Sequence, residues 1–206
     1  MTDLIVLVAD NNMRAALASL LHRHERLGIH PLQFDAYAHI RKDPGVFKTC
    51  QDFFRQFLLS HRYALAVFDW EGCGSNLSAD ETRKLVQQNL DINGWKNRSA
   101  VIVIDPELEN WIWSPSRHVA RALGWGDFPG LQRWLTQQQF LVPGQGKPLR
   151  PKEAMEAALR QVKLPRSSAI YAKVASTVDF ENCSDGAFNH LVSTLRSWFP
   201  AVQILG

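Results

Sequence analysis

The 206-residue sequence is poor in cysteine and has no long hydrophobic run. Its three cysteines, Cys50, Cys73 and Cys183, are far apart and include no CxxC pair, so neither a disulfide framework nor a thiolate zinc site is expected. No apolar run approaches the roughly 18 residues that are needed to cross a bilayer. Residues 1–4 include no basic residue ahead of the first apolar run, which argues against a secretory signal. We therefore expect a cytoplasmic protein with no membrane span.

Several phosphate-binding and nucleophile motifs are also missing. The sequence has no GxxxxGK[ST] loop and no GxSxG elbow. Gly72 and Gly74 do not form a dinucleotide-binding loop, because the third glycine of that motif would stand at Leu77. His22 and His24 are two residues apart on a predicted helix, so they point to different faces and do not favour a zinc site.

The composition is that of an ordinary globular protein, with 46% hydrophobic and 21% charged residues. The length allows a sizeable core, in one domain or in one domain with an appendage. The net charge of +3 is unevenly distributed, because residues 147–166 contain six lysines and arginines but only two glutamates. This basic segment is consistent with a polyanion-binding face and also with a solvated helix surface, which is the commoner explanation.

The most informative stretch is residues 63–74. Residues 63–68 are apolar or aromatic and predict a strand that is buried on both faces, as in a parallel sheet. Asp69 and Glu71 follow at its carboxyl end, where ligands bind in open α/β sheets. Gly72 and Gly74 allow the backbone to turn there and to approach a ligand closely. Burial of a strand requires no acid at its end, so the two carboxylates indicate function.

Two further apolar strands are predicted, at residues 4–9 and 100–104. Each of them is followed by carboxylates, which are Asp10 after the first strand and Asp105, Glu107 and Glu109 after the second. If the strands are parallel neighbours, these acids meet Asp69 and Glu71 at one edge of the sheet.

The remaining patterns predict one more strand, at residues 30–34, and a series of helices. We expect the helices at about residues 11–28, 49–58, 78–90, 109–113, 114–123, 131–135, 151–162, 168–180 and 185–198. Pro-Gly pairs predict loops at residues 38–46 and 143–148. Strands alternate with helices in the N-terminal part and helices dominate the C-terminal part, so the predicted fold class is α/β, with a mainly parallel sheet flanked by helices.

Helix starts can be predicted from capping residues. Asn11 or Asn12 is expected to cap the first helix and Thr49 the helix that follows the loop at residues 38–46. Ser78 and Glu81 form a capping-box pattern.

The strand-end carboxylates favour a divalent cation. Clustered carboxylates repel one another and raise one another's pKa unless a cation is present. Mg²⁺ accepts carboxylate oxygens, keeps several waters and then binds phosphate. Asp69 and Glu71, joined by an acid from the first strand, therefore predict a Mg²⁺ or Mn²⁺ site. The alternative is that strand-end acids only cap helices and solvate turns.

This layout resembles the Toprim-type fold, in which an acid follows the first strand and an acid-x-acid motif follows a later one. Residues 106–111 (PELENW) are closer still to small Toprim-like proteins. Residues 69–74, 147–154 and 171–188 resemble proteins of bacterial methylation-associated phage-defence systems. The resemblance covers most of the chain and implies a Toprim-like α/β domain at residues 1–142, with a helical C-terminal extension at residues 143–206 packed on the same core.

The resemblance implies metal-dependent cleavage of nucleic-acid phosphodiesters. Together with the strand-end pattern, it suggests a metal shell and a set of basic side chains. The expected metal ligands are Asp69, Glu71, Glu107 and Glu109. The expected catalytic residues are Asp10, Asp69, Glu71, Glu109 and Lys173, with Asp10 as acid/base or second ligand. The expected nucleic-acid contacts are His39, Arg41, Lys147, Arg150 and Lys152.

Two residues depart from the Toprim pattern. Asp10 stands where those enzymes have glutamate, and Glu71 stands where their metal motif has a second aspartate. Either change could retune the site or remove catalysis. The leading hypothesis is a Mg²⁺- or Mn²⁺-dependent nuclease of an antiphage system that acts with other defence proteins. The alternative is a non-catalytic adaptor that binds a partner protein or nucleic acid.

Overall fold

The structure is a computed structural model that describes residues 1–113, 116–142, 144–179 and 183–201. Its centre is a four-stranded, all-parallel sheet in the order β2-β1-β3-β4. The strands are β1 (Thr2–Val8), β2 (Phe34–Ala38), β3 (His61–Asp69) and β4 (Ser99–Ile104). The predicted α/β class with a parallel sheet flanked by helices is confirmed.

The two central strands are buried on both faces. The side chains of Leu4 to Val8 in β1 and of Ala64 to Phe68 in β3 have no exposed surface. Val8 pairs with Val67 and Asp69 pairs with Ile104, so the carboxyl ends of β1, β3 and β4 lie at one edge. The sequence pattern of apolar runs followed by acids therefore places the acids together, because parallel strands all end at the same edge.

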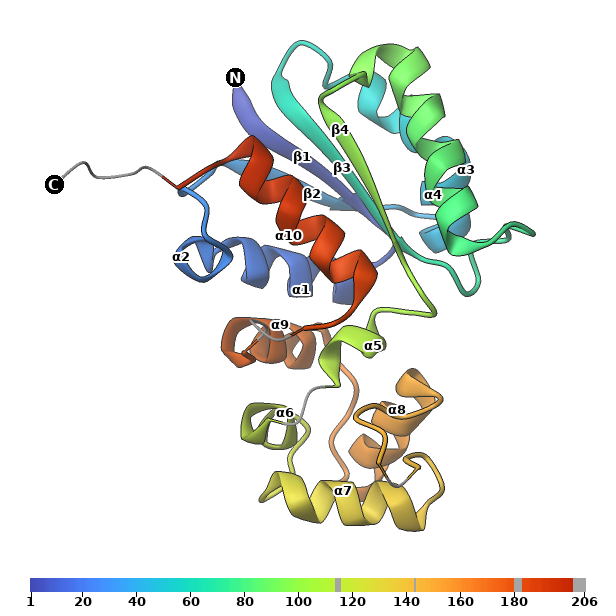
Figure 1. Ribbon diagram of the computed structural model, residues 1–206, viewed down its shortest axis with the longest axis vertical. Helices are drawn as coiled ribbons and strands as arrows, with labels where there is room; N and C mark the ends of the chain where they lie inside the picture. The colour runs from blue at the N-terminus through green and yellow to red at the C-terminus, as the bar shows by residue number, and fades with distance from the viewer. Residues whose placement is uncertain (114–115, 143, 180–182, 202–206) are drawn as a thin grey trace, which may run out of the picture.

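Helices cover both faces of the sheet (Figure 1). One face is covered by α3 (Lys42–Arg55) and α4 (Ala79–Leu90), and the other by α1 (Asn11–Leu21) and α10 (Gly186–Trp198). The short α2 (His24–Leu27) follows α1, and a π-helical turn, η1 (Asp91–Trp95), follows α4. Trp198 of α10 stacks on Tyr63 of β3, with ring centroids 4.5 Å apart.

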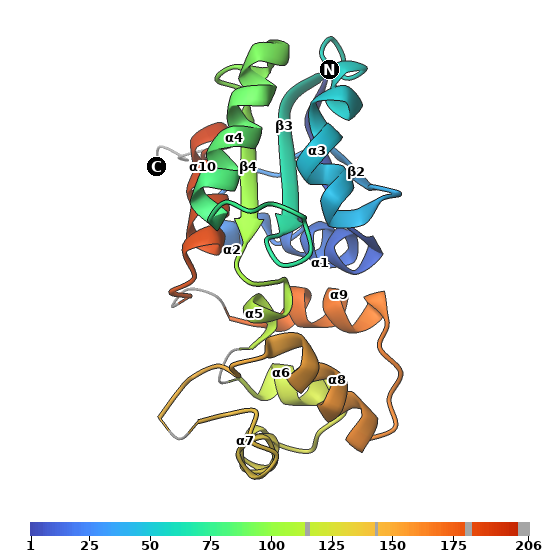
Figure 2. The ribbon, with the colours of Figure 1, turned by 90° about the vertical axis from the view of Figure 1, so that its right-hand side faces the viewer.

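A group of helices lies beyond the carboxyl ends of the strands (Figure 2). They are α5 (Glu109–Ile112), α6 (Arg117–Ala122), α7 (Phe128–Gln137), α8 (Pro151–Gln161) and α9 (Ser168–Thr177). Their buried residues, such as Leu131 and Met155, belong to the same hydrophobic cluster as Leu65 of β3. Residues 143–206 therefore contribute α8 and α9 beyond the edge of the sheet and α10 on its face. No helix in the described ranges is long and apolar enough to cross a membrane.

The second strand begins later than predicted. Residues 30–34 were expected to form it, but β2 is Phe34–Ala38 and pairs with residues 4–8 of β1. The alternation of β2 continues past Phe34, with Asp35 and Tyr37 exposed and Ala36 and Ala38 half-buried. This edge strand contains few large apolar residues, so its hydrophobic signal is weak.

The predicted loop at residues 38–46 is wrong from Lys42 onward, where α3 begins. Pro44 is tolerated there because the first turn of a helix needs no amide donor. Thr49 is not the cap of this helix but lies inside it, where its hydroxyl donates to the Gly45 carbonyl at 2.8 Å. The earlier start places Asp43 in the first turn, at the edge that carries the acids.

The cap of the first helix also differs from the prediction. Asp10, rather than Asn11 or Asn12, is the N-cap of α1, and its Oδ1 accepts the Met13 amide at 2.9 Å. The capping box of Ser78 and Glu81 at the start of α4 is confirmed. The predicted helix start at residues 114–115 and the end of the predicted helix at Phe180 lie outside the described residues.

Candidate functional site

Four carboxylates from four segments lie near one another at the carboxyl edge of the sheet. Asp10 follows β1, Asp43 lies in the first turn of α3, Asp69 ends β3, and Glu107 follows β4. The Asp69 amide donates to Asp43 Oδ1 at 2.8 Å, which joins two of these segments directly. Electrostatic repulsion links Asp43 to Asp10 and links Asp69 to Asp43 and Glu107.

Asp69 is the most strongly perturbed acid of this edge. Burial raises the pKa of its carboxyl well above the ordinary value of 3.8, and repulsion from Asp43 and Glu109 raises it further. A hydrogen bond of 2.8 Å from the Leu108 amide to Asp69 Oδ1 opposes this shift in the pKa. A nearby cation would stabilise the ionised form of a carboxyl whose pKa is raised in this way. Asp69 is therefore the centre of the candidate site.

Asp43 was missed in the sequence analysis. Burial is the largest cause that raises the pKa of its carboxyl, and the Asp69 amide and the charge of Lys152 lower it. Its position in the sequence could have revealed it. Asp43 precedes Pro44 in a segment that follows a strand of the same parallel sheet, so it is expected at the same edge as the other acids. Because that segment was interpreted as a loop, its acid was not placed with the others.

Glu107 is 7% exposed and is held by the start of α8. Its Oε1 accepts the Lys152 amide at 2.9 Å, and its Oε2 lies 3.9 Å from the Lys152 ammonium. Burial raises the pKa of the Glu107 carboxyl, while Lys152 lowers it. Lys152 therefore brings one positive charge to the carboxylate edge.

Glu109 is 2% exposed and belongs to a different network. Its Oε1 accepts a hydrogen bond of 2.7 Å from Arg166 Nη2 and another from the Tyr171 hydroxyl. Arg166 also donates through Nε to the Tyr171 oxygen at 2.6 Å and through Nη1 to Glu156 at 3.1 Å. This ion pair ties α5 to the segment before α9 and gives the Glu109 carboxylate a structural partner.

The predicted metal ligands are therefore not equivalent. Glu71 is exposed, and its amide donates to the Pro106 carbonyl at 3.0 Å. Among the described residues, no group of three or more histidine, cysteine, aspartate or glutamate side chains is arranged to hold a metal ion. The pair Asp69 and Asp43 remains, and it offers hard oxygen donors of the kind that Mg²⁺ accepts from one or two carboxylates, with waters completing its shell.

Two predicted nucleic-acid contacts lie just after β2. His39 Nε2 is 3.2 Å from the Thr49 hydroxyl, and Arg41 Nη2 donates to the same oxygen at 3.3 Å. Burial and the charge of Arg41 lower the pKa of His39, so the imidazole favours its neutral form. Both residues directly precede α3, which provides Asp43.

The other predicted basic residues do not form one patch. Arg150 pairs with Glu153 at 2.5 Å, Lys152 pairs with Glu107, and Lys147 lines a separate cavity. Lys173 is exposed on α9, and no contact in the described part of the chain brings it to the carboxylates. Lys152 is thus the predicted lysine that the fold brings to the acids.

Comparisons with known proteins give no relative: no family model matches the chain, and no curated protein or solved structure matches it either.

Proposed function

We propose that this protein is a divalent-cation-dependent phosphodiesterase that acts on nucleic acid, within a bacterial antiphage system as its resemblance implies. The observation that carries the proposal is the pair Asp69 and Asp43 at the carboxyl edge of a parallel sheet. Both carboxyls have raised pKa values because they are partly buried and lie beside other acids. A site that disfavours two negative charges in this way is suited to a cation.

Asp69 and Asp43 would hold Mg²⁺ or Mn²⁺, and the ion would supply charge stabilisation to the phosphate. Asp10 caps α1 beside them and adds negative charge to the same edge. The Lys152 ammonium lies beside Glu107 at this edge and would attract a phosphate, and Arg41, the residue before α3, would add a second positive charge. Glu71 is an exposed carboxylate, and we assign to it the acceptance of a proton from the attacking water.

The second candidate function is that of a non-catalytic adaptor. It is favoured by the partners of two predicted ligands, since Arg166 neutralises Glu109 and Lys152 is paired with Glu107. A chain that uses these acids for internal ion pairs could retain the fold as a platform for nucleic acid or for another defence protein.

One experiment separates the two functions. Purified protein is incubated with labelled single- and double-stranded DNA and RNA, with Mg²⁺ or Mn²⁺, and binding is measured in parallel. Asp69→Asn should abolish cleavage, whereas Asp52→Asn, an exposed acid on α3 away from the edge, should retain it. Binding of nucleic acid without cleavage in either metal, alone or with the partner proteins, would select the adaptor.

A further inference from the structure

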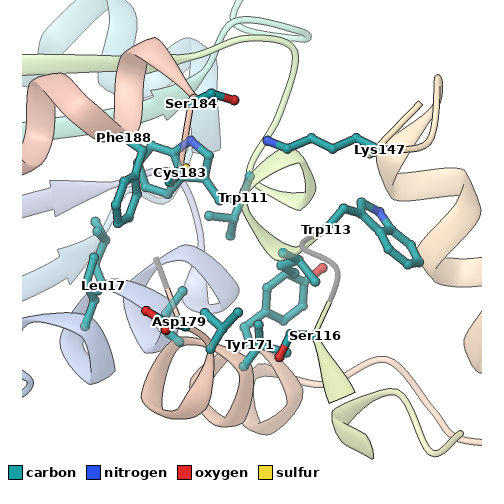
Figure 3. Close-up of a pocket in the computed structure, with 18 of the residues that line it drawn as sticks. Leu17, Trp111, Trp113, Ser116, Lys147, Tyr171, Asp179, Cys183, Ser184 and Phe188 are labelled. Atoms are coloured by element: carbon teal, nitrogen blue, oxygen red, sulfur yellow. The ribbon is translucent and has the colours of Figure 1, made fainter. Parts of the chain in front are cut away.

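A cavity of about 740 Å³ lies beyond the sheet edge (Figure 3), and its described lining residues do not include Asp43, Asp69 or Glu107. Residues of α1, α5, α9 and α10 line it, together with the loop that carries Lys147. Its volume falls within the range of small-molecule sites, about 300–1,000 Å³. The edge of a parallel sheet is also where α/β proteins place ligands.

Most of the cavity wall is apolar. Leu17 and Leu20 come from α1, Ile112 from α5, Val174 from α9 and Phe188 from α10. Contact between these side chains and a hydrocarbon ligand would remove apolar surface of both from water, which favours binding. The wall therefore fits the apolar body of a ligand.

The aromatic polar atoms at this wall already have partners. The Trp111 indole N–H donates to Asp185 Oδ1 at 2.9 Å, and its ring meets Phe188 edge-on at 5.2 Å. The Tyr171 hydroxyl is bonded to Glu109. These rings present carbon to the cavity rather than donors for the edge of a nucleobase, which argues against a nucleotide as the occupant.

One end of the cavity carries a positive charge. Figure 3 shows the Lys147 side chain pointing from its loop toward the side of the cavity that carries Trp111 and Ser184. Lys147 is half-buried and forms no ion pair with any residue that the structure describes. It is the single lysine or arginine among the described lining residues, and the one acid among them, Asp179, lies away from Lys147 on the other side of the cavity in Figure 3. The charge at the Lys147 end therefore matches a monoanion better than a phosphate ester.

We propose that this cavity binds an organic monocarboxylate with an extended apolar body, of the medium-chain fatty-acid class. The carboxylate pairs with the Lys147 ammonium, and the hydrocarbon lies against the side chains of α1, α5, α9 and α10. A cation at one end of a hydrocarbon wall gives the bound anion a fixed orientation. The site is distinct from the proposed cation site and does not depend on phosphodiesterase activity.

The test uses decanoate as the probe, with decan-1-ol as its neutral counterpart, in calorimetry and tryptophan fluorescence on the full chain. Lys147→Met keeps an unbranched side chain that is only one atom shorter and removes the charge, so it should weaken decanoate binding at least tenfold and leave decan-1-ol unchanged. The matched control is Lys96→Met, an exposed lysine outside the cavity, which should bind decanoate like the unmodified protein.

Two further variants make the result decisive. Ala175→Phe places a ring into the cavity and should abolish the binding of both ligands, provided that circular dichroism shows a folded protein. Asp69→Asn should bind decanoate normally, which separates this site from the proposed cation site. The inference is overturned if decanoate does not bind, if Lys147→Met binds it unchanged, or if adenosine monophosphate binds more tightly and Ala175→Phe blocks that binding.

Discussion

At the scale of single residues, the strand-end acids divide into two kinds. Asp69 has a raised carboxyl pKa and a hydrogen bond from one backbone amide, and its nearest acids repel it. Glu109 is more deeply buried but has Arg166 as its partner. Carboxylates that end or follow neighbouring strands are therefore destabilised by repulsion in one case and stabilise the fold through an ion pair in the other.

Asp69→Asn should stabilise the metal-free protein. The folded-state pKa of Asp69 lies above its ordinary value of 3.8, so folding becomes less favourable as the pH rises from there through the folded pKa. Asparagine keeps the acceptor for the Leu108 amide and removes the charge. With a chelator present, the melting temperature of the variant should exceed that of the unmodified protein at pH 8, by about 2–4 °C for each kcal/mol, and the difference should shrink toward pH 4.

Glu109→Gln should destabilise the fold. It leaves the Arg166 guanidinium, which is 31% exposed, without its buried carboxylate partner. We expect a loss of about 2 kcal/mol in the free energy of unfolding, within the range for a lost charged hydrogen bond and below that of a fully buried ion pair. Glu156→Gln is the matched control, because Glu156 bonds the same arginine from a more exposed position and should cost less than about 1 kcal/mol. Equal losses in urea denaturation would contradict this assignment.

The sequence predicted that Asp69, Glu107 and Asp10 lie at one edge, because apolar runs reveal strands and parallel strands end together. It could not reveal that Glu109 pairs with Arg166, since 57 residues separate them and nothing local marks the contact. Asp43 was missed for a different reason, which is that its Pro-Gly neighbours are equally typical of a turn and of a first helical turn.

At the scale of elements, the start of α1 links stability to the candidate site. Asp10 was predicted to be acid/base or a metal ligand, and it is also the N-cap of α1. The Asp10 Oδ1 atom accepts the Met13 amide and caps the helix, which leaves the other carboxylate oxygen for a role at the candidate site. The two roles can be separated by replacing Asp10 with residues that keep or lose the cap.

Asp10→Ala should lower the free energy of unfolding by about 1 kcal/mol, because the first turn of α1 loses its capping acceptor. Asp10→Asn should retain stability within a few tenths of a kcal/mol, because asparagine caps equally well. The measurement is urea denaturation of the three proteins. If Asp10 also acts at the phosphate, Asp10→Asn should reduce cleavage although it is fully folded. If both variants are equally unstable, the charge of Asp10 rather than its cap supports α1.

At the scale of the whole molecule, the helices beyond the sheet edge bring charges from distant parts of the sequence to the strand ends. Lys152 of α8 reaches Glu107, and Arg166 reaches Glu109, so part of the negative charge of the edge is balanced by the C-terminal half. The sequence predicted these helices individually. It could not predict that they cover the strand ends and that α10 returns to the face of the sheet, because amphipathic periodicity identifies a buried face and not its partner.

Because charges from distant parts of the chain meet at this edge, the effect of a metal ion is measured on the stability of the whole fold. A cation that binds only the folded state stabilises it by mass action, by about 2.7 kcal/mol at one hundred times its dissociation constant. We expect Mn²⁺ to raise the melting temperature more than Mg²⁺, since Mn²⁺ binds oxygen ligands with less demand for retained waters and ideal geometry. Asp69→Asn and Asp43→Asn should each remove this shift.

Glu109→Gln is the informative comparison, because Glu109 was also predicted to be a metal ligand. Since its carboxylate is bonded to Arg166 and Tyr171, the variant should melt at a lower temperature yet keep the metal-induced increase. The measurement is thermal denaturation with chelator, Mg²⁺ or Mn²⁺ for all four proteins. A shift that disappears in Glu109→Gln and persists in Asp43→Asn would restore the original ligand set and remove Asp43 from the site. If neither metal raises the melting temperature of the unmodified protein, the proposed cation-dependent function is wrong and the adaptor function is favoured.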